Sequence, residues 1–329
     1  MPNILISESI QSEALQALEA RFDVLYLPDL WKTPSALVEK IADCRALIVR
    51  NQTQVTATLM SAAPELLVVG RAGVGLDNVD LKFARETGIV IAFTPDQNAI
   101  SVAELAIGLM LALARFIPAA DQDTKRGNWN RHKFIGTEVY GKTLGIVGAG
   151  KIGYLTARRA MAFGMRVLAH DPFLSQDNIL LSELQAELVS LDELLARADV
   201  VSCHLPASPQ TADLLNETCF EKMKSGALFI NTSRGAVMSE PAILRALKSG
   251  RIAGAALDVR ATEPPQRGEM EMLPNVILMP HVGAWTHEAQ NRVTAAIFED
   301  VTRVLEGKPA LNAVYDPLPG RKALKQLDR

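Results

Sequence analysis

The sequence predicts an α/β protein built on parallel β-sheets, and three observations support this class. Short apolar runs alternate with helical patterns along most of the chain, as in consecutive strand–helix–strand units. The 329 residues favour two domains, because one domain has about 100 to 200 residues. Residues 148–153 form a glycine-rich segment between a strand-like run and a helical stretch, which is where a parallel sheet binds its ligand.

Composition narrows the class of function. Hydrophobic residues make up 48% and charged residues 22%, which is typical of a globular protein and not of a disordered one. The formal net charge of −3 provides no basic surface for a nucleic-acid backbone, and 5% aromatic residues leave few platforms for stacking bases. We therefore expect a small-molecule partner and no nucleic acid.

The sequence predicts a cytoplasmic protein without a membrane partner. Cys44, Cys203 and Cys219 are an odd number of cysteines scattered along a long chain, which favours a reducing compartment. The N-terminal MPNILISESI lacks the positive and apolar regions of a signal peptide. The longest apolar stretch, residues 102–114, falls short of the ~20 residues that span a bilayer.

The first third of the chain predicts strands that alternate with helices. Strands are expected over residues 3–7, 24–27, 46–49 and 66–69, and a helix over residues 12–20. The apolar run 101–116 predicts a helix that packs on more than one side, at a domain junction or a subunit interface. Residues 121–141 are polar and rich in turn formers, so we expect them to be irregular.

The remainder predicts a second series of strands. They are expected over residues 142–148, 166–170, 200–205, 227–231, 254–259 and 276–279. Helices are expected over residues 154–163 and 286–306. Because strands and helices alternate again, this part also predicts a parallel sheet.

The glycine-rich segment has the context of a dinucleotide-binding site. It follows a strand and opens a helix. In such a site Gly148 makes the tight turn, Gly150 lets the backbone approach a pyrophosphate, and Gly153 lets the helix pack closely on the strand. The helix N-terminus supplies N–H groups to the anion. The alternative is a glycine-rich turn that binds nothing.

Asp171 stands at the end of the next strand, where it can accept both ribose hydroxyls of an adenosine. Its carboxylate would repel a 2′-phosphate, and residues 172–175 contain no Arg or Lys to neutralise one. NAD is therefore favoured over NADP. The alternative is that Asp171 is only a turn residue before Pro172.

Polar residues follow four further strand-like runs, where ligands of an open parallel sheet bind. With these segments in view, the chain resembles the D-isomer-specific 2-hydroxyacid dehydrogenases and is most similar to their D-3-phosphoglycerate dehydrogenase branch. The resemblance covers nearly the whole chain through motifs that occur in family order: LIVRNQTQV, VVGRAGVGLDNVD, TPDQNAISVAEL, GKTLGIVGAGKIG, HLPASPQT, FINTSRGAVM, AALDVRATEPP and NVILMPHVGAWT.

The resemblance implies three catalytic residues, Arg234, Glu263 and His281. His281 would donate a proton to the substrate carbonyl during reduction and remove the hydroxyl proton during oxidation. Glu263 would hold the imidazole in one tautomer and stabilise its protonated form. Arg234 would offer a bidentate fork to the substrate carboxylate and carbonyl. Taken alone, each of these residues has a structural interpretation, as an ion-paired arginine or a structural histidine.

The resemblance also implies cofactor contacts outside the glycine motif. They come from Lys151, Ile152, His204, Pro206, Thr232, Ser233, Asp258 and Gly283. The family pattern DVFxxEP is DVRATEP here, so that Arg260 replaces an aromatic residue while Glu263 stays in register. No pair of Cys or His residues has the spacing of a zinc site, so no metal is expected.

The segment from Arg71 through Ala72, Gly73 and Val74 resembles the family's substrate loop, in which backbone N–H groups cradle a carboxylate. Arg50 and Arg71 both stand near strand ends. We therefore expect a substrate with a second anionic group, in a range that includes 3-phosphoglycerate, glyoxylate or hydroxypyruvate, and sulfolactate. Alternatively, each arginine is a surface ion-pair partner.

The resemblance implies a flavodoxin-like substrate-binding domain from residues 1–100 and 287–329, with a Rossmann-fold NAD-binding domain, residues 101–286, inserted between. Closure of such domains excludes water from hydride transfer. A short form without a regulatory domain and a homodimer built by the apolar helix and the segment around Trp129 are also expected. The alternative function is an NAD-sensing binding protein or corepressor on the same fold.

Overall fold

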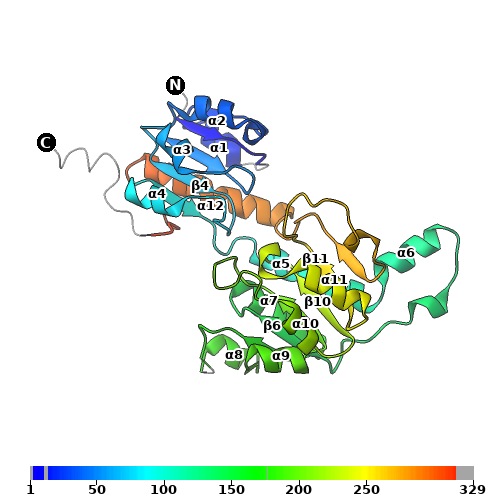
Figure 1. Ribbon diagram of the computed structural model, residues 1–329. Coiled ribbons are helices and arrows are strands. Elements are labelled where there is room, and N and C mark those ends of the chain that lie inside the picture. Colours follow the sequence, from blue (N-terminus) through cyan, green and yellow to red (C-terminus); the bar gives the residue numbers. More distant parts are fainter. Residues whose placement is uncertain (1–2, 11–13, 176, 316–329) are drawn as a thin grey trace. The chain divides into compact units, whose positions relative to one another are not determined.

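The computed structural model describes residues 3–10, 14–175 and 177–315. The chain divides into two compact units, Met1–Asn98 with Trp285–Arg329 (unit 1) and Ala99–Ala284 (unit 2). In Figure 1, unit 1 carries the blue, cyan and orange-red segments, and unit 2 most of the rest. Each unit contains one parallel sheet with helices, which confirms the predicted α/β class. Residues 316–329 lie outside the described residues.

Unit 1 has five described strands in the order β2-β1-β3-β4-β5, the strand order of flavodoxin-like sheets. The strands are β1 (Ile4–Ile6), β2 (Val24–Tyr26), β3 (Ala46–Val49), β4 (Val68–Arg71) and β5 (Val90–Phe93). The helices are α1 (Ala14–Glu19), α2 (Pro34–Ile41), α3 (Ala57–Ser61), α4 (Leu81–Glu86) and α12 (His287–Leu305), with a 3-10 turn at Leu30–Lys32.

The sheet of unit 1 is buried on both faces. Leu5, Leu47 and Val69 pack with residues of α2 and α3, whereas alternate strand residues such as Ile48 pack with α12. Because successive side chains of a strand point to opposite faces, such strands read as continuous apolar runs. β4 lies close to α12 (Figure 1) because Gly70 has no side chain: a Cβ there would come within 2.8 Å of Val301.

Unit 2 has seven described strands in the order β12-β11-β10-β9-β6-β7-β8, which extends the strand order of dinucleotide-binding folds. The strands are β6 (Thr143–Val147), β7 (Arg166–His170), β8 (Glu187–Leu188), β9 (Val200–Cys203), β10 (Ala227–Asn231), β11 (Ile252–Leu257) and β12 (Val276–Leu278). The helices are α5 (Ala99–Ala114), α6 (Ile117–Lys125), α7 (Lys151–Ala162), α8 (Ile179–Glu183), α9 (Leu191–Arg197), α10 (Glu217–Lys222) and α11 (Glu240–Lys248), with 3-10 turns at Arg131–Phe134, Gly235–Val237 and Met270–Met272.

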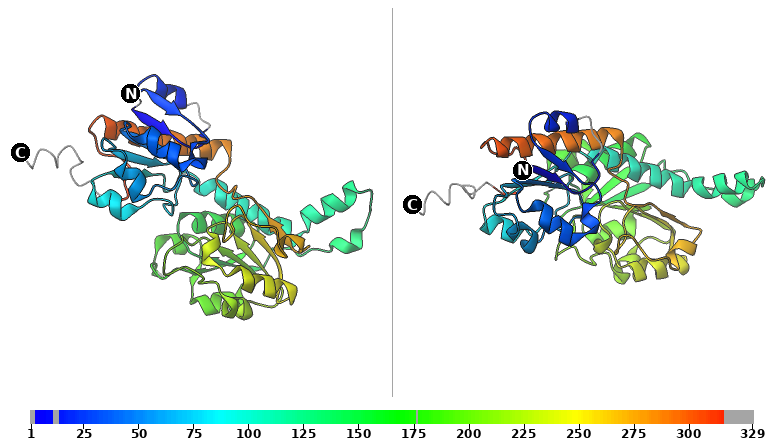
Figure 2. Two further views of the ribbon diagram at one scale, coloured as in Figure 1. Left: turned by 45° about the horizontal axis from the view of Figure 1, so that its top comes forward. Right: turned by 90° about the horizontal axis from the view of Figure 1, so that it is seen from above.

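The apolar helix α5 is largely buried inside unit 2, where it packs against α7, β10 and β11. The chain then turns at Phe116, whose φ is 53°, and enters α6 with Pro118 in its first turn. The expectation of an irregular segment from residue 121 is therefore wrong up to Lys125, because α6 continues to that residue. Figure 2 shows α6 projecting from the rest of unit 2.

Two strands were not predicted. β5 is a run of four residues in the apolar segment after Gly88, and β8 has only two residues, too few for a periodic pattern. β4 begins at Val68 and includes Arg71, two residues later than expected, while Leu66 is buried beside the sheet. The helix after the glycine motif begins at Lys151, inside the motif.

Among the described residues, no single helix is long and apolar enough to cross a membrane. α5 and α6 together meet that test by length and composition, but they are bent by 61° relative to each other.

Candidate active site

The motifs of unit 2 all follow the carboxyl ends of its strands. Because the strands are parallel, these ends form one edge of the sheet, where open α/β sheets bind ligands. Along this edge stand, in spatial order, His281 after β12, Glu263 after β11, Arg234 after β10, His204 after β9, Gly148 after β6 and Asp171 after β7.

The glycine loop leaves room for a ligand. Gly148 has a φ of 91°, and a Cβ on Gly153 would come within 2.2 Å of the Gly148 carbonyl oxygen. Gly150 is the residue before α7, and as a glycine it has no side chain to cap the helix. A Cβ at this position would meet nothing within 4 Å. No side chain of the cap residue therefore occupies the first N–H groups of α7, the groups that would bind a pyrophosphate.

Asp171 is held beside this loop. Its Oδ2 accepts the backbone N–H of Ala149 at 3.0 Å, and its Oδ1 accepts that of Phe173 at 3.0 Å. The bond to Phe173 closes a turn, as expected if Asp171 were only a turn residue before Pro172. The bond to Ala149 ties the carboxylate to the glycine loop, and each oxygen retains a further acceptor position for a ribose hydroxyl.

Two buried polar atoms stand at the ends of β9 and β10. His204 shares a hydrogen bond through Nε2 with Ser202 Oγ at 2.9 Å, while its Nδ1 has no hydrogen-bond partner among the described residues. Burial lowers the pKa of His204 to about 4, so the ring is neutral. Thr232 Oγ1 is likewise buried and unpartnered in the described structure. Buried polar atoms need partners, and a bound cofactor would supply them here.

Arg234 lies on a turn that Asn231 shapes. The Asn231 side chain donates to the Arg234 carbonyl at 3.0 Å and accepts from the Ser233 N–H at 3.0 Å. Asn231 was not among the predicted site residues. An asparagine as the last residue of a largely buried strand is the signal that indicates such a turn.

Glu263 and His281 form a hydrogen-bonded pair in which Glu263 Oε2 lies 2.7 Å from His281 Nδ1. Burial alone would raise the pKa of Glu263, but the hydrogen bond and charge of His281 lower it below its ordinary value. An ionised carboxylate only accepts hydrogen bonds, so Nδ1 carries the proton that binds it. The other ring nitrogen, Nε2, takes no part in this bond.

Asp258 holds the backbone around His281. His281 has a φ of 56°, and its N–H donates to the Asp258 carbonyl at 2.8 Å. The buried Asp258 carboxylate accepts the N–H groups of Val282 and Gly283, both at 2.8 Å. A non-glycine residue in the left-handed region is uncommon and persists where its surroundings fix it. Burial raises the pKa of Asp258 despite these two bonds.

In unit 1, Arg50 is held by several groups. Its guanidinium lies 4.5 Å from the centroid of the Trp285 ring and donates to Gln290 Oε1. Its backbone N–H donates at 2.8 Å to Glu8, a buried carboxylate that also accepts N–H groups of Gln52 and Thr53. Burial lowers the pKa of Arg50, and the nearby Glu8 opposes that shift. Glu8 was not predicted from the sequence.

Arg71 is 8% exposed and folds over Gly73, where a Cβ would clash with its Nη1. The Ala72 N–H donates to the Val49 carbonyl and the Gly73 N–H to the Arg71 carbonyl, both at 2.8 Å. Two N–H groups of the predicted substrate loop, which also includes Val74, therefore have partners inside unit 1.

Comparison with known proteins tests the resemblance. Residues 107–283 match the family model "D-isomer specific 2-hydroxyacid dehydrogenase, NAD binding domain". The chain belongs to this family. Unit 2 is accordingly an NAD-binding domain, and the residues that would hold NAD are the loop at Gly148 to Gly153, Asp171, His204 and Thr232.

Curated relatives match the chain over nearly its whole length. The D-3-phosphoglycerate dehydrogenase of Methanocaldococcus jannaschii is 42% identical over 318 residues, which are 96% of this chain and 60% of that protein. The chain thus spans about three-fifths of the length of such curated relatives.

Two solved structures share the fold of the chain. The TT0316 protein from Thermus thermophilus has a TM-score of 0.89 and 34% identity, with 95% of this chain and 99% of that chain covered. A glyoxylate reductase from Paecilomyes thermophila has a TM-score of 0.85 and 31% identity, with 94% and 97% covered.

The described part of the chain contains no group of three or more His, Cys, Asp or Glu side chains that could hold a metal ion. Cys44, Cys203 and Cys219 are buried free thiols.

Proposed function

We propose that the chain is an NAD-dependent oxidoreductase that transfers a hydride between nicotinamide and C2 of a small D-2-hydroxyacid or 2-oxoacid. The observation that carries this proposal is the Glu263–His281 pair, 2.7 Å apart, on the same sheet edge as a dinucleotide-binding loop. NAD, when bound, supplies or accepts the hydride.

His281 acts as the acid in reduction and as the base in oxidation. Its proton moves between Nε2 and the oxygen on C2, because Nδ1 is bound to Glu263. The Glu263 carboxylate stabilises the imidazolium and fixes the tautomer. Arg234, on the turn that Asn231 shapes, binds the substrate carboxylate and carbonyl and orients C2.

The substrate carries a second anionic group, which Arg50 and Arg71 bind. The support for this finer assignment is local. Arg50 is half-buried and held by Trp285, Gln290 and Glu8, unlike a surface ion-pair partner, whose side chain stays solvated. An incoming anion would stabilise such a partly desolvated cation. The candidates remain phosphoglycerate-like, glyoxylate or hydroxypyruvate, and sulfolactate-like acids; the curated relatives named above are D-3-phosphoglycerate dehydrogenases.

The chain forms a homodimer through the α6 arm, residues 115–140. Large apolar side chains are exposed along the arm, among them Ile117 (53%), Trp129 (74%) and Ile135 (75%). Beside it is a cavity of about 380 Å³, lined in part by Leu113 and Val139. In a twofold dimer the arm of each copy covers the apolar surface of the other.

The buried free thiols support a reducing compartment such as the cytoplasm.

The test is NADH oxidation with a panel of 2-oxoacids that differ in their second anionic group. We expect turnover of at least one of them, and a loss of about a hundredfold to ten-thousandfold in kcat for His281→Ala. His287→Ala, an exposed histidine at the start of α12, is the matched control. Turnover that His281→Ala leaves unchanged would falsify the acid–base assignment, and a wild-type chain that binds NADH but oxidises it with no oxoacid would favour a binding protein.

A further inference from the structure

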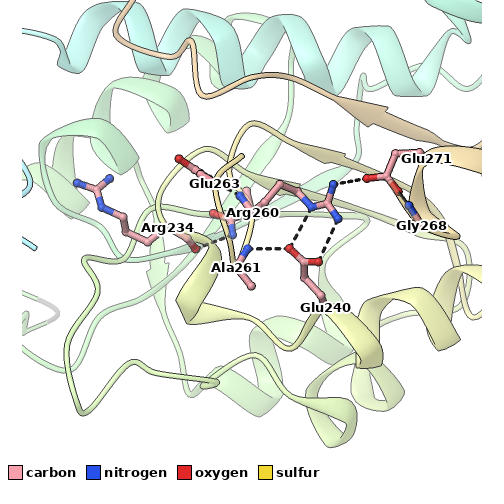
Figure 3. Close-up of polar contacts among 8 residues, drawn as sticks. Arg234, Glu240, Arg260, Ala261, Glu263, Gly268 and Glu271 are labelled. Carbon is pink, nitrogen blue, oxygen red and sulfur yellow. Dashed lines mark hydrogen bonds and ion pairs between the residues drawn. The ribbon is translucent and has the colours of Figure 1, made fainter. Parts of the chain in front are cut away.

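Arg260 occupies the position at which the family pattern has an aromatic residue, yet its side chain is only 9% exposed. Its guanidinium donates through Nε and Nη2 to the two carboxylate oxygens of Glu240, both at 3.0 Å. Its Nη1 donates to Glu271 at 2.6 Å. Figure 3 shows the guanidinium between the two carboxylates. A bidentate arginine–carboxylate pair fixes orientation as well as distance.

The two carboxylates also bind the backbone on either side of Glu263. Glu240 accepts the N–H of Ala261 at 2.7 Å, and Glu271 accepts the N–H of Gly268 at 2.7 Å. The loop that carries Glu263 is therefore tied at two points to one ion cluster, Glu240–Arg260–Glu271 (Figure 3).

Arg260 also contacts the surroundings of the proposed catalytic residues through its backbone. Its N–H donates to Oε1 of Glu263 at 3.1 Å, while Oε2 of that carboxylate binds His281. A Cβ on Gly235 would lie 2.0 Å from the Arg260 carbonyl, so the Arg260 peptide packs directly on the residue after Arg234. One residue thus touches both the Glu263 carboxylate and the Arg234 turn.

We propose that Arg260 is a positioning residue for the Glu263–His281 pair. Its side chain anchors the loop between Glu240 and Glu271, and its N–H then holds Glu263 Oε1 so that Oε2 faces His281 Nδ1. This inference rests on the proposed function for its effect on turnover, but its geometry lies within unit 2.

If Arg260 acts through Glu263, its removal matters only while Glu263 is present. We therefore expect Arg260→Met to lower kcat about tenfold to a hundredfold, because small displacements of catalytic groups have effects of this size. In a Glu263→Ala background the same substitution should change kcat by less than about twofold, because coupled residues are non-additive. KM for NADH should stay unchanged in both backgrounds. Arg260→Lys replaces Arg260→Met in the cycle if the methionine variant does not fold.

The matched control is Arg197→Met, which removes a bidentate pair with Glu187 in the same unit, far along the chain from Glu263. It should lower thermal stability without lowering kcat. Equal fold-losses for Arg260→Met with and without Glu263 would overturn the proposal, and so would an unchanged kcat.

A second measurement does not depend on turnover. The imidazole Nδ1–H of His281, bound to a carboxylate, should give a downfield proton resonance, which is assigned by its absence in His281→Ala. We expect Arg260→Met to remove or broaden this resonance and Arg197→Met to leave it unchanged. A resonance that survives in Arg260→Met would overturn the positioning role even if the chain proves not to be a dehydrogenase.

Discussion

The backbone carbonyl of Asp258 accepts the N–H of His281 at 2.8 Å while His281 holds a φ of 56°. The Asp258 side chain then takes the next two N–H groups. Asp258 therefore fixes the backbone of His281, the proposed acid–base residue, and of the two residues that follow it.

Asp258→Ala leaves the N–H groups of Val282 and Gly283 without their acceptor. We expect it to lower kcat at least about tenfold by displacing His281, and to lower the free energy of unfolding by about 3 kcal/mol through the lost buried hydrogen bonds. Steady-state kinetics and urea unfolding measure the two effects. Asp199→Asn is the control, because Asp199 accepts the N–H of Thr143 and pairs with Lys224 at the opposite end of the strands. An Asp258→Ala variant that is less stable but fully active would contradict the prediction.

Glu271 predicts how stability depends on pH. Its hydrogen bond from Arg260, with that from Gly268, lowers the pKa of Glu271 to about 2 from an ordinary 4.5. Because the folded-state pKa is the lower one, unfolding takes up a proton between these values. The stabilisation is complete above pH 4.5 and is lost as the pH falls toward 2.

The Tm difference between wild type and Glu271→Gln should therefore stay constant from pH 7 to 5 and narrow below pH 4.5. Differential scanning calorimetry over this range measures it. Glu269→Gln, which affects only the ion pair with Lys248, provides the comparison. A Tm difference that widens as the pH falls would contradict the predicted loss of stabilisation by Glu271 at low pH.

Asp171 predicts cofactor choice. Asp171→Asn keeps an acceptor for the Ala149 N–H but removes the charge that repels a 2′-phosphate. We expect the ratio of kcat/KM for NADPH to that for NADH to rise about tenfold, mainly because kcat/KM for NADH falls. An unchanged ratio would indicate that Asp171 is only a turn residue and does not select the cofactor.

Arg50 predicts discrimination between anions. Arg50→Ala should lower kcat/KM for a dianionic 2-oxoacid about tenfold to a hundredfold more than for a monoanionic one, which is the size of a charged hydrogen bond. Arg71→Ala is measured in parallel. Trp285→Leu removes the ring beside Arg50. It should also lower kcat/KM more for the dianionic than for the monoanionic 2-oxoacid, but by only a few fold, about the size of a cation–π contact. Arg21→Ala, at an exposed pair with Glu306, is the control. Equal losses on both substrates would rule out a second anion at Arg50.

The α6 arm predicts the oligomeric state. Light scattering should give about twice the chain mass of 35.7 kDa. Replacing Ile117 and Ile135 by serine should shift the mass toward one chain, because both side chains are exposed on the arm. A wild-type mass of one chain would contradict the dimer.

Local patterns predicted the strands of both sheets well where apolar runs were long, as at residues 166–170 and 227–231, which β7 and β10 match. The glycine loop and the strand-end position of His281 were also predictable, because turns and strand ends leave local signals. Contacts between distant segments were not. Glu8 binds the backbone of Arg50 from 42 residues away, and Glu240 binds Arg260 from 20 residues away. No periodic pattern encodes such pairs, so the roles of Glu8 and Glu240 were found only in the structure.

The order of strands along the sheet of unit 2 has a consequence for evolution and engineering. The glycine loop and Asp171, on which nucleotide preference depends, follow β6 and β7, whereas Arg234, Glu263 and His281 follow β10, β11 and β12; His204 after β9 and Thr232 after β10 lie between them. Neighbouring strands are about 4.8 Å apart, so the two groups occupy adjacent halves of one rigid edge. Nucleotide preference and acid–base chemistry can therefore change independently, by substitutions in different halves of the sheet, without a compensating change in the other half.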